Sequence, residues 1–193
     1  WSIAMRPDRK GFATGSADKC IKFWELKTSS TRAEGFKLKN IRSLQVADDV
    51  LCVKYSPDGR FIAASLLDLT VKVFFEDSLK FYLNLFGHKL PVMSLDFSHD
   101  SRLLITASAD KNVKIWGLDF GDCRKSVFAH QEAITGVCFL PATYQFMTCS
   151  KDGLVKYWTD DQYTMLQKLD GHKKEVWGMA LSSRGETLVT AAS

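Results

Sequence analysis

One pattern of residues returns along this 193-residue chain and constrains its fold more than any other feature. Each copy has a turn aspartate followed by a short run in which lysine alternates with apolar residues; the runs read IKFW, VKVF, VKIW and VKYW. The aspartates are Asp18, Asp68, Asp110 and Asp152, so the steps between them are 50, 42 and 42 residues. A period of this length marks an array of small structural units, because each unit buries its apolar faces only by packing against its neighbours.

Each copy has the pattern of several short β-strands. In the third copy, apolar and polar residues alternate over 92–97, and the β-rich runs 103–106 and 113–116 are bounded by turn-forming residues. A more variable fourth run follows, at 125–128 in the third copy and at 165–169 in the fourth. Four short strands in a unit of this length are typical of one blade of a β-propeller. The sequence therefore predicts an all-β propeller of four-stranded blades.

The repeat divides the chain into four expected blades and the start of a fifth. The expected boundaries are 1–48, 49–90, 91–132, 133–174 and 175–193. The same step would place the next turn aspartate one residue beyond Ser193, so we expect these blades to be part of a larger propeller of about seven blades. An open arc would leave apolar blade faces bare, which is why we expect the rest of the propeller to lie outside this chain.

The first copy is eight residues longer than the others because of a polar stretch after its tryptophan. This stretch, residues 25–40, reads ELKTSSTRAEGFKLKN and is weakly hydrophobic. We interpret it as a surface loop between the third and fourth strands of the first blade. Two roles stay open, a solvated hairpin extension and a docking loop for a partner.

Composition and charge set limits on the class of protein. No run approaches the roughly 18 apolar residues of a membrane-spanning helix, so no membrane partner is expected. The net charge of +4 permits contact with nucleic acid without arguing for it. The cysteines are odd in number and widely spaced, which favours buried, reduced thiols of an intracellular protein over disulfides or zinc ligands. They are Cys20, Cys52, Cys123, Cys138 and Cys149.

Four residue types recur together: a histidine before the first strand, a threonine on the second, the turn aspartate and the tryptophan of the third. This set resembles the WD-repeat family, in which the four side chains form a hydrogen-bonded chain inside one blade. The resemblance implies two complete sets, which are His88, Thr106, Asp110 and Trp116, then His130, Thr148, Asp152 and Trp158. It implies two partial sets, which are Thr14, Asp18 and Trp24, then His172 and Thr190. Since a buried carboxylate must be paired or hydrogen-bonded, such a chain would stiffen a blade.

The second copy departs from this set. Val46 stands where the histidine belongs, Ala64 replaces the threonine and Phe74 replaces the tryptophan, so Asp68 remains as a turn residue only. Replacing all the polar partners together costs less folding stability than replacing one of them. A single replacement would leave a buried polar group without a partner, which costs about 1–3 kcal/mol. We expect blade two to be held by apolar packing.

His, Thr and Asp together could also be interpreted as a hydrolase triad. The repetition argues against that interpretation, because an enzyme needs one site and this set recurs with a tryptophan as its fourth member. The chain has no nucleophile elbow, no phosphate-binding loop and no His/Cys spacing typical of a metal site. We therefore expect no catalytic residue, no metal, no cofactor and no small-molecule substrate.

Lysines are expected to gather on one face of the propeller. The loops before the first strands and those between the second and third strands open on the same side, and they carry Lys19, Lys89, Lys111, Lys151, Lys173 and Lys174. Two roles stay open for these lysines: they keep a β-rich surface soluble, or they bind RNA phosphate or an acidic protein segment. No aromatic residues interleave with basic ones as they would in an RNA-stacking platform.

The less regular segments of the sequence carry a narrower resemblance. The stretches 23–59, 87–100 and 107–130, and above all GLDFGDC after Trp116, resemble the Dip/Utp-twelve type of WD-repeat subunit in the UTP-B subcomplex of the small-subunit processome. The resemblance implies a scaffold in ribosome biogenesis and processing of pre-rRNA toward 18S rRNA, in the nucleolus of the nucleus. The implied partners are other WD-repeat subunits of UTP-B, a small nucleolar ribonucleoprotein and pre-rRNA.

An alternative is another interaction scaffold on the same fold, such as a substrate receptor of a ubiquitin ligase. Receptors for the cullin-four adaptor commonly carry WDxR after the third strand. The corresponding segments here read WELK, WGLD and WTDD, which argues mildly against that alternative.

Overall fold

Every regular element in the described part of the chain is a β-strand, as the repeat predicts. The computed structural model describes residues 1–28 and 36–193, which contain eighteen strands and no helix. The strands form four four-stranded antiparallel sheets and one two-stranded sheet. The all-β propeller architecture is therefore confirmed, and among the described residues there is no helix long and apolar enough to cross a membrane.

Each sheet takes its strands consecutively from the chain, and we number the sheets as blades one to five. Blade one contains β1 (Ser2–Met5), β2 (Gly11–Gly15), β3 (Cys20–Thr28) and β4 (Phe36–Gln45). Blade two contains β5 (Val50–Tyr55), β6 (Phe61–Leu66), β7 (Val71–Phe75) and β8 (Phe81–Leu85). Blade three contains β9 (Val92–Phe97), β10 (Leu103–Ser108), β11 (Asn112–Gly117) and β12 (Cys123–Phe128). Blade four contains β13 (Ile134–Phe139), β14 (Phe146–Ser150), β15 (Leu154–Trp158) and β16 (Met165–Asp170), and blade five contains β17 (Val176–Leu181) and β18 (Leu188–Ala192).

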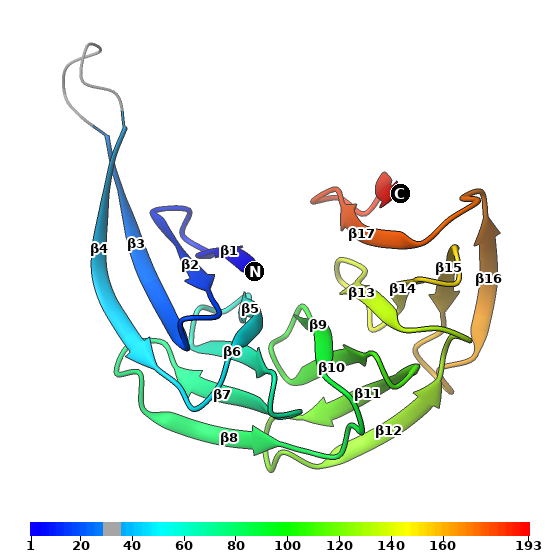
Figure 1. Cartoon of the computed structure of the whole chain (residues 1–193), viewed down its shortest axis with the longest axis horizontal. Coiled ribbons are helices and arrows are strands. Elements are labelled where there is room, and N and C mark those ends of the chain that lie inside the picture. Colours follow the sequence, from blue (N-terminus) through cyan, green and yellow to red (C-terminus); the bar gives the residue numbers. More distant parts are fainter. Residues whose placement is uncertain (29–35) are drawn as a thin grey trace.

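The blades follow one another along an arc, with their first strands innermost. Figure 1 shows β1, β5, β9, β13 and β17 around the inside of the arc and β4, β8, β12 and β16 along the outside. Successive innermost strands contact one another from β1 to β17. The turns at the two ends of the strands therefore lie on two opposite faces of the arc. The expected domain boundaries remain a prediction.

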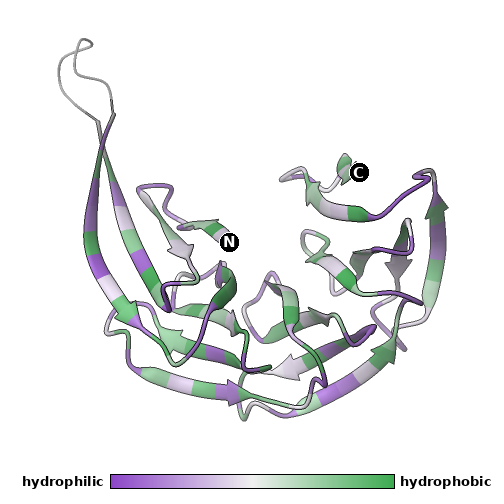
Figure 2. Cartoon of the chain, viewed as in Figure 1, coloured by the Kyte–Doolittle hydropathy of each residue, from purple (hydrophilic) through white to green (hydrophobic). Residues whose placement is uncertain are grey.

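The core lies between the blades rather than within any one of them. Each of the four apolar clusters combines side chains from two neighbouring blades. The second strands β6 and β10 are buried at every position, whereas β16 is exposed along its whole length. Hydrophilic segments accordingly recur along outer strands such as β4 and β16 (Figure 2). Burial is greatest in the second strands and least in the outermost ones, which explains why the fourth run of each copy has the least regular sequence.

A β-bulge recurs at the aromatic residue of each third strand. The pairing of the third with the fourth strand shifts at Trp24, Phe74, Trp116 and Trp158. A bulge bends the strand and redirects the side chain beside it. The same irregularity in four blades places the four aromatic rings equivalently.

Hydrogen bonds from backbone to side chain join the innermost strands of neighbouring blades. The N–H of Val53 in blade two donates to Ser2 Oγ of blade one at 3.1 Å. The N–H of Val137 in blade four donates to Ser94 Oγ of blade three at 3.3 Å. A short polar side chain pointing toward the next blade thus binds a backbone group that lies outside that blade's own hydrogen-bond ladder.

The long connection in blade one is in part a hairpin extension. β3 and β4 stay paired well beyond the blade, from Glu25 opposite Lys39 to Thr28 opposite Phe36, and they project outward in Figure 1. The expectation of a loop over 25–40 is therefore wrong for the paired residues, where alternating residues continue the strands. The remainder of that stretch, 29–35, lies outside the described residues.

The cysteines differ in burial. All five are free thiols. Cys52 and Cys149 are buried, Cys20 and Cys138 are half-buried, and Cys123 is exposed. The expectation of buried thiols is wrong for Cys123, because it begins the outermost strand β12, whose outer edge has no neighbouring strand among the described residues.

Candidate functional site

The His–Thr–Asp–Trp set of blade three is joined by hydrogen bonds. The Nδ1 atom of His88 is 2.9 Å from Asp110 Oδ2, and its Nε2 atom is 2.8 Å from Thr106 Oγ1. The indole Nε1–H of Trp116 donates to the same threonine oxygen at 2.9 Å. The loop before β9, the strands β10 and β11 and the turn between them are therefore tied together inside one blade.

The β10–β11 turn places the carboxylate of Asp110 beside the imidazole. Lys111 adopts a φ of 72°, and Asp110 Oδ1 accepts the N–H of Asn112 at 3.0 Å, which closes an Asx turn. Asp110 Oδ2 also accepts the N–H of Lys89 at 2.8 Å. Burial alone would raise the pKa of Asp110, but the hydrogen bonds from His88 and Lys89 outweigh burial and hold that pKa well below its ordinary value.

Blade four repeats this arrangement. His130 Nδ1 is 2.9 Å from Asp152 Oδ2, His130 Nε2 is 2.8 Å from Thr148 Oγ1, and Trp158 Nε1–H donates to that oxygen at 3.0 Å. Burial lowers the pKa of His130, because desolvation disfavours the charged imidazolium, although Asp152 opposes this effect. The pKa of Asp152 is also lowered: its burial acts in the opposite direction, but the hydrogen bond from His130 prevails.

These protonation states fix the direction of each hydrogen bond in blade four. A neutral imidazole that donates Nδ1–H to Asp152 has a lone pair at Nε2, which accepts the hydroxyl proton of Thr148. The threonine oxygen in turn accepts the indole N–H. Thr148 is fully buried, as is Thr106 in blade three, so no substrate reaches either hydroxyl. The arrangement acts as a structural tie rather than as an activated nucleophile.

The partial sets of blades one and five are joined only in part. In blade one Trp24 Nε1–H donates to Thr14 Oγ1 at 3.0 Å, while Asp18 lies apart and forms an ion pair with Lys22 at 2.9 Å. In blade five His172 Nε2 is 2.7 Å from Thr190 Oγ1. In each of the four sets, the threonine hydroxyl is hydrogen-bonded to at least one other member of the set.

Blade two has an apolar group in place of the network. Ala64 is completely buried and Phe74 nearly so, in the cluster shared with blade one, and Val46 packs against that cluster. Asp68 is exposed and accepts the N–H of Thr70 at 3.0 Å, so it acts in the turn alone. The neighbouring Ser65 hydroxyl is the one buried side-chain polar atom without a hydrogen-bond partner in the described residues.

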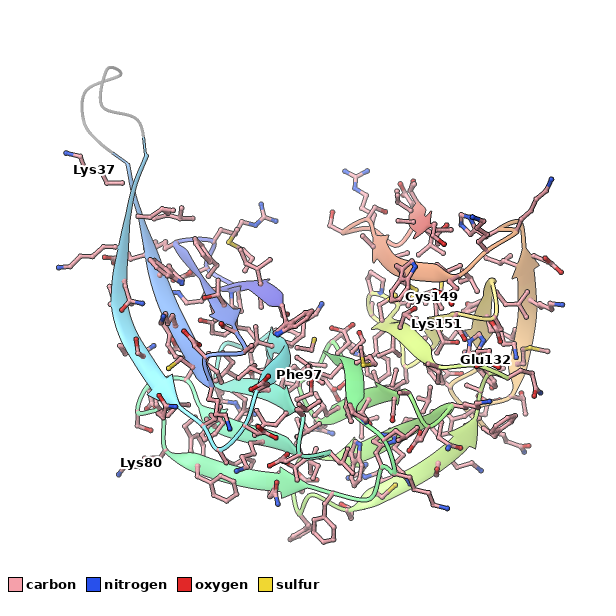
Figure 3. The ribbon with its side chains drawn as sticks, viewed as in Figure 1. Lys37, Lys80, Phe97, Glu132, Cys149 and Lys151 are labelled. Carbon is pink, nitrogen blue, oxygen red and sulfur yellow. The ribbon has the colours of Figure 1, made fainter. Side chains whose placement is uncertain are left out.

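The lysines expected on one face differ in their surroundings. Lys19 pairs with Asp48 at 3.2 Å, and Lys111 lies 3.8 Å from Glu132. Lys151 Nζ lies 4.2 Å from the ring centroid of Trp177, a contact that the sequence analysis missed. Lys151 and Glu132 are labelled on the blade-four side of the arc in Figure 3.

Of the remaining lysines of that face, Lys89, Lys173 and Lys174 are exposed and Lys151 is half-buried. Lys173 and Lys174 line a cavity of about 390 Å³ with Lys151. Lys89 is exposed, and its backbone N–H binds Asp110. The six lysines therefore divide into two that lie beside carboxylates and four for which no carboxylate partner occurs within the described part of the chain.

A second cavity of about 480 Å³ lies along the innermost strands. Asp96 there accepts the N–H of Phe139 from the next blade at 2.9 Å and lies 3.5 Å from Lys54 Nζ of the preceding blade. Burial raises the pKa of Asp96, and Lys54 opposes that shift. Burial also raises the pKa of Cys138 to about 12, so the thiol remains protonated and is not a nucleophile.

This group of residues was not predicted from the sequence. Lys54, Asp96 and Cys138 occupy the same position in three successive copies, 42 residues apart, and that coincidence was the available signal. All three line the same cavity, and Asp96 joins three blades through Lys54 and the N–H of Phe139.

We expect the melting temperature to fall between about pH 7 and about pH 5, because burial holds His130 neutral. The ordinary histidine pKa is 6.5, so below that pH the unfolded chain binds a proton that the folded chain does not bind, and stability decreases. Melting curves of the wild type and of His130→Asn across this range test the assignment. The variant has no titrating group at this position and should show the smaller pH dependence; equal slopes would contradict it.

Comparison with known proteins places this geometry in a family. The model described as the WDR3 second beta-propeller domain matches residues 1–193. U3 small nucleolar RNA-associated protein 12 of Saccharomyces cerevisiae is 52% identical over 104 residues, which cover 50% of this chain and 11% of that protein. WD repeat-containing protein 3 of Homo sapiens is 50% identical over 95 residues, which cover 48% of this chain and 10% of that protein.

A similar protein also occurs in Dictyostelium discoideum, where the WD repeat-containing protein 3 homolog is 47% identical over 99 residues, covering 49% of this chain and 10% of that protein. The matched segments span about a tenth of the length of these curated relatives. The family model, in contrast, covers the chain from its first residue to its last. The chain belongs to the family of WDR3 second β-propeller domains.

Proposed function

We propose that this chain is one propeller of a non-catalytic scaffold subunit in ribosome biogenesis. In this role the subunit helps to assemble the small-subunit processome for processing of pre-rRNA toward 18S rRNA, in the nucleolus. The observation that carries the proposal is the match of the whole chain to the WDR3 second β-propeller domain, together with 52% identity to a protein named for its association with U3 small nucleolar RNA.

The proposed partners are the other WD-repeat subunits of UTP-B, a small nucleolar ribonucleoprotein and pre-rRNA. The last two would be bound directly or through the complex. The shape of the chain supports a scaffold, because a row of blades presents many separate loops on two faces while its framework stays fixed. The burial of Thr106 and Thr148 supports a non-catalytic role, since the repeated His–Thr–Asp sets offer no accessible nucleophile.

Affinity purification of the tagged full-length protein from nuclear extract tests the proposal. We expect U3 small nucleolar RNA to be enriched over an unrelated nucleolar RNA, together with WD-repeat subunits of UTP-B. The matched control is an unrelated tagged propeller protein expressed at the same level, which accounts for nonspecific binding to propeller surfaces.

Two results would contradict the proposal. Recovery of cullin and adaptor proteins in place of U3 RNA would favour a ubiquitin-ligase substrate receptor. U3 RNA at the level of the control propeller would remove the link to the processome.

A further inference from the structure

At two of the boundaries between neighbouring blades, which we call seams, one of the six lysines lies beside a carboxylate. At the seam between blades one and two, Lys19 follows the turn aspartate and pairs with Asp48 of the next blade at 3.2 Å. At the seam between blades three and four, Lys111 occupies the equivalent turn position and lies 3.8 Å from Glu132. In both cases the next blade supplies the carboxylate from the second position after the histidine site. Each of these two lysines therefore has a carboxylate beside it, although the lysine side chains stay 47% and 41% exposed.

The seam between blades four and five has different residues at the same two positions. Gly153 replaces the turn lysine, and Lys174 replaces the carboxylate. Gly153 has a φ of 81°, and a Cβ atom there would lie 3.2 Å from the carbonyl oxygen of Lys174 and 3.3 Å from that of His172. Glycine therefore lets the loop before β17 approach the β14–β15 turn closely. Of these two positions, one is therefore positively charged and the other is uncharged.

Three lysines surround the cavity at this seam. Lys173 and Lys174 are exposed, and Lys151 stands one residue before the turn aspartate, where the other three blades have alanine or leucine. Asp152 also lines the cavity of about 390 Å³, but its carboxylate is bound by His130 and is almost fully buried. Glu175 is the other acidic residue of the lining. The lining, which Ser193 completes, thus has three lysines against two carboxylates, and this small excess of positive charge suits an anion.

An exposed aromatic ring lies beside these cations. Trp177 is 51% exposed, and Lys151 Nζ lies 4.2 Å from its ring centroid. The equivalent residue of blade three is Met93, which is 39% exposed although blade three has a neighbouring blade on each side. Leu51 and Thr135, at the equivalent positions of blades two and four, are half-buried, so Trp177 is the most exposed of the four residues. The indole offers a flat apolar surface next to the anion-binding cavity.

We propose that Lys151, Lys173, Lys174 and Trp177 form a binding site for single-stranded RNA. A backbone phosphate occupies the lysine-lined cavity, and an unpaired base stacks on the indole of Trp177. This proposal rests on the proposed function and adds to it the surface that contacts RNA. An acidic peptide would use the lysines alone, whereas cations beside an exposed tryptophan match the two parts of a nucleotide.

The test measures binding of a fluorescein-labelled oligouridylate of about twelve nucleotides to the full-length protein by anisotropy at several salt concentrations. We expect Trp177→Ala to weaken binding roughly fivefold to a hundredfold and Trp177→Phe to retain most of the affinity. The double variant Lys173→Ala/Lys174→Ala should weaken binding and reduce the slope of log affinity against log salt by about one to one and a half. The matched control is Lys19→Ala/Lys111→Ala, which removes the same charge from two ion-paired lysines and should have a much smaller effect.

A second measurement locates the contact within the full-length protein. Ultraviolet crosslinking of a thiouridine-containing form of the oligonucleotide, followed by peptide mapping, should identify the peptide that contains Trp177. Crosslinks confined to other parts of the protein would overturn the site, as would equal losses in the two double lysine variants. Undiminished binding by Trp177→Ala, with an oligoglutamate peptide competing as well as RNA, would show an acidic-protein site in its place. Wild-type protein that copurifies with U3 RNA but fails to bind the oligonucleotide would overturn this site alone, whereas the reverse result would overturn the proposed function.

Discussion

Replacement of Asp110 by alanine should lower the free energy of unfolding of the full-length protein's propeller by about 3 kcal/mol. The Asp110 side chain is only 5% exposed and accepts hydrogen bonds from His88, Lys89 and Asn112. Its removal leaves the imidazole of His88, 1% exposed, without its acceptor. Hydrogen bonds to a charged group contribute about 1.5–3 kcal/mol, and a buried donor left unpaired adds its own desolvation cost. Urea denaturation followed by tryptophan fluorescence measures the change.

The matched control is Asp68→Ala in blade two. Asp68 occupies the same turn, but it is exposed and binds only Thr70, so its loss should cost about 1 kcal/mol. Asp110→Asn keeps one acceptor oxygen and should fall between the two alanine variants. Equal losses for Asp110→Ala and Asp68→Ala would show that the hydrogen-bonded network adds nothing to the turn.

The second large effect is expected from adding a single polar group to blade two. Ala64→Thr should cost about 2 kcal/mol, because it inserts a methyl and a hydroxyl where Ala64 is fully buried against Phe74. In blade three the equivalent hydroxyl, that of Thr106, is satisfied by an imidazole and an indole. Blade two has neither partner. The same denaturation experiment measures the cost.

Restoring the partners should reverse much of that loss. The triple variant Val46→His, Ala64→Thr and Phe74→Trp recreates the blade-three set around Asp68. We expect it to be more stable than Ala64→Thr alone, because the new hydroxyl then has a donor and an acceptor. The corresponding control is Ala63→Thr, at a fully buried neighbouring position that the restored set does not reach. A triple variant less stable than the single one would show that the blade-two backbone cannot hold the network.

The strands could be placed from the sequence because each copy repeats one pattern of burial. The runs 103–106 and 113–116 fall within β10 and β11. Their buried residues have counterparts of similar type 42 residues away. The partners of the His–Thr–Asp–Trp sets came from family resemblance, and their contacts lie within single blades. Residues within one blade keep the same separations in every copy, so a repeat can identify them.

Contacts between blades could not be predicted in the same way. Lys151 and Trp177 lie 26 residues apart in different copies, and their meeting depends on the angle between two sheets and on the close approach at Gly153. The salt bridge of Lys19 with Asp48 likewise crosses a seam. Nothing in one copy specifies which loop of the next copy it will face. The pairing of residues 25–28 with 36–39 agrees with the solvated hairpin extension, one of the two roles left open for this stretch; the sequence did not decide between them, because polar residues can continue a hairpin once its strands are already paired.

The consecutive order of strands within each sheet has a consequence for synthesis on the ribosome. No four-stranded sheet waits for a distant segment, so a complete blade can leave the ribosome after every 42 residues or so in this part of the chain. Each new blade then finds its docking surface on the blade made just before it, through bonds such as that from Val137 to Ser94. At about 5–20 residues per second, the apolar face of the newest blade stays bare for about two to eight seconds. The length of the repeat thus sets the time for which a nascent chain exposes a surface prone to aggregation.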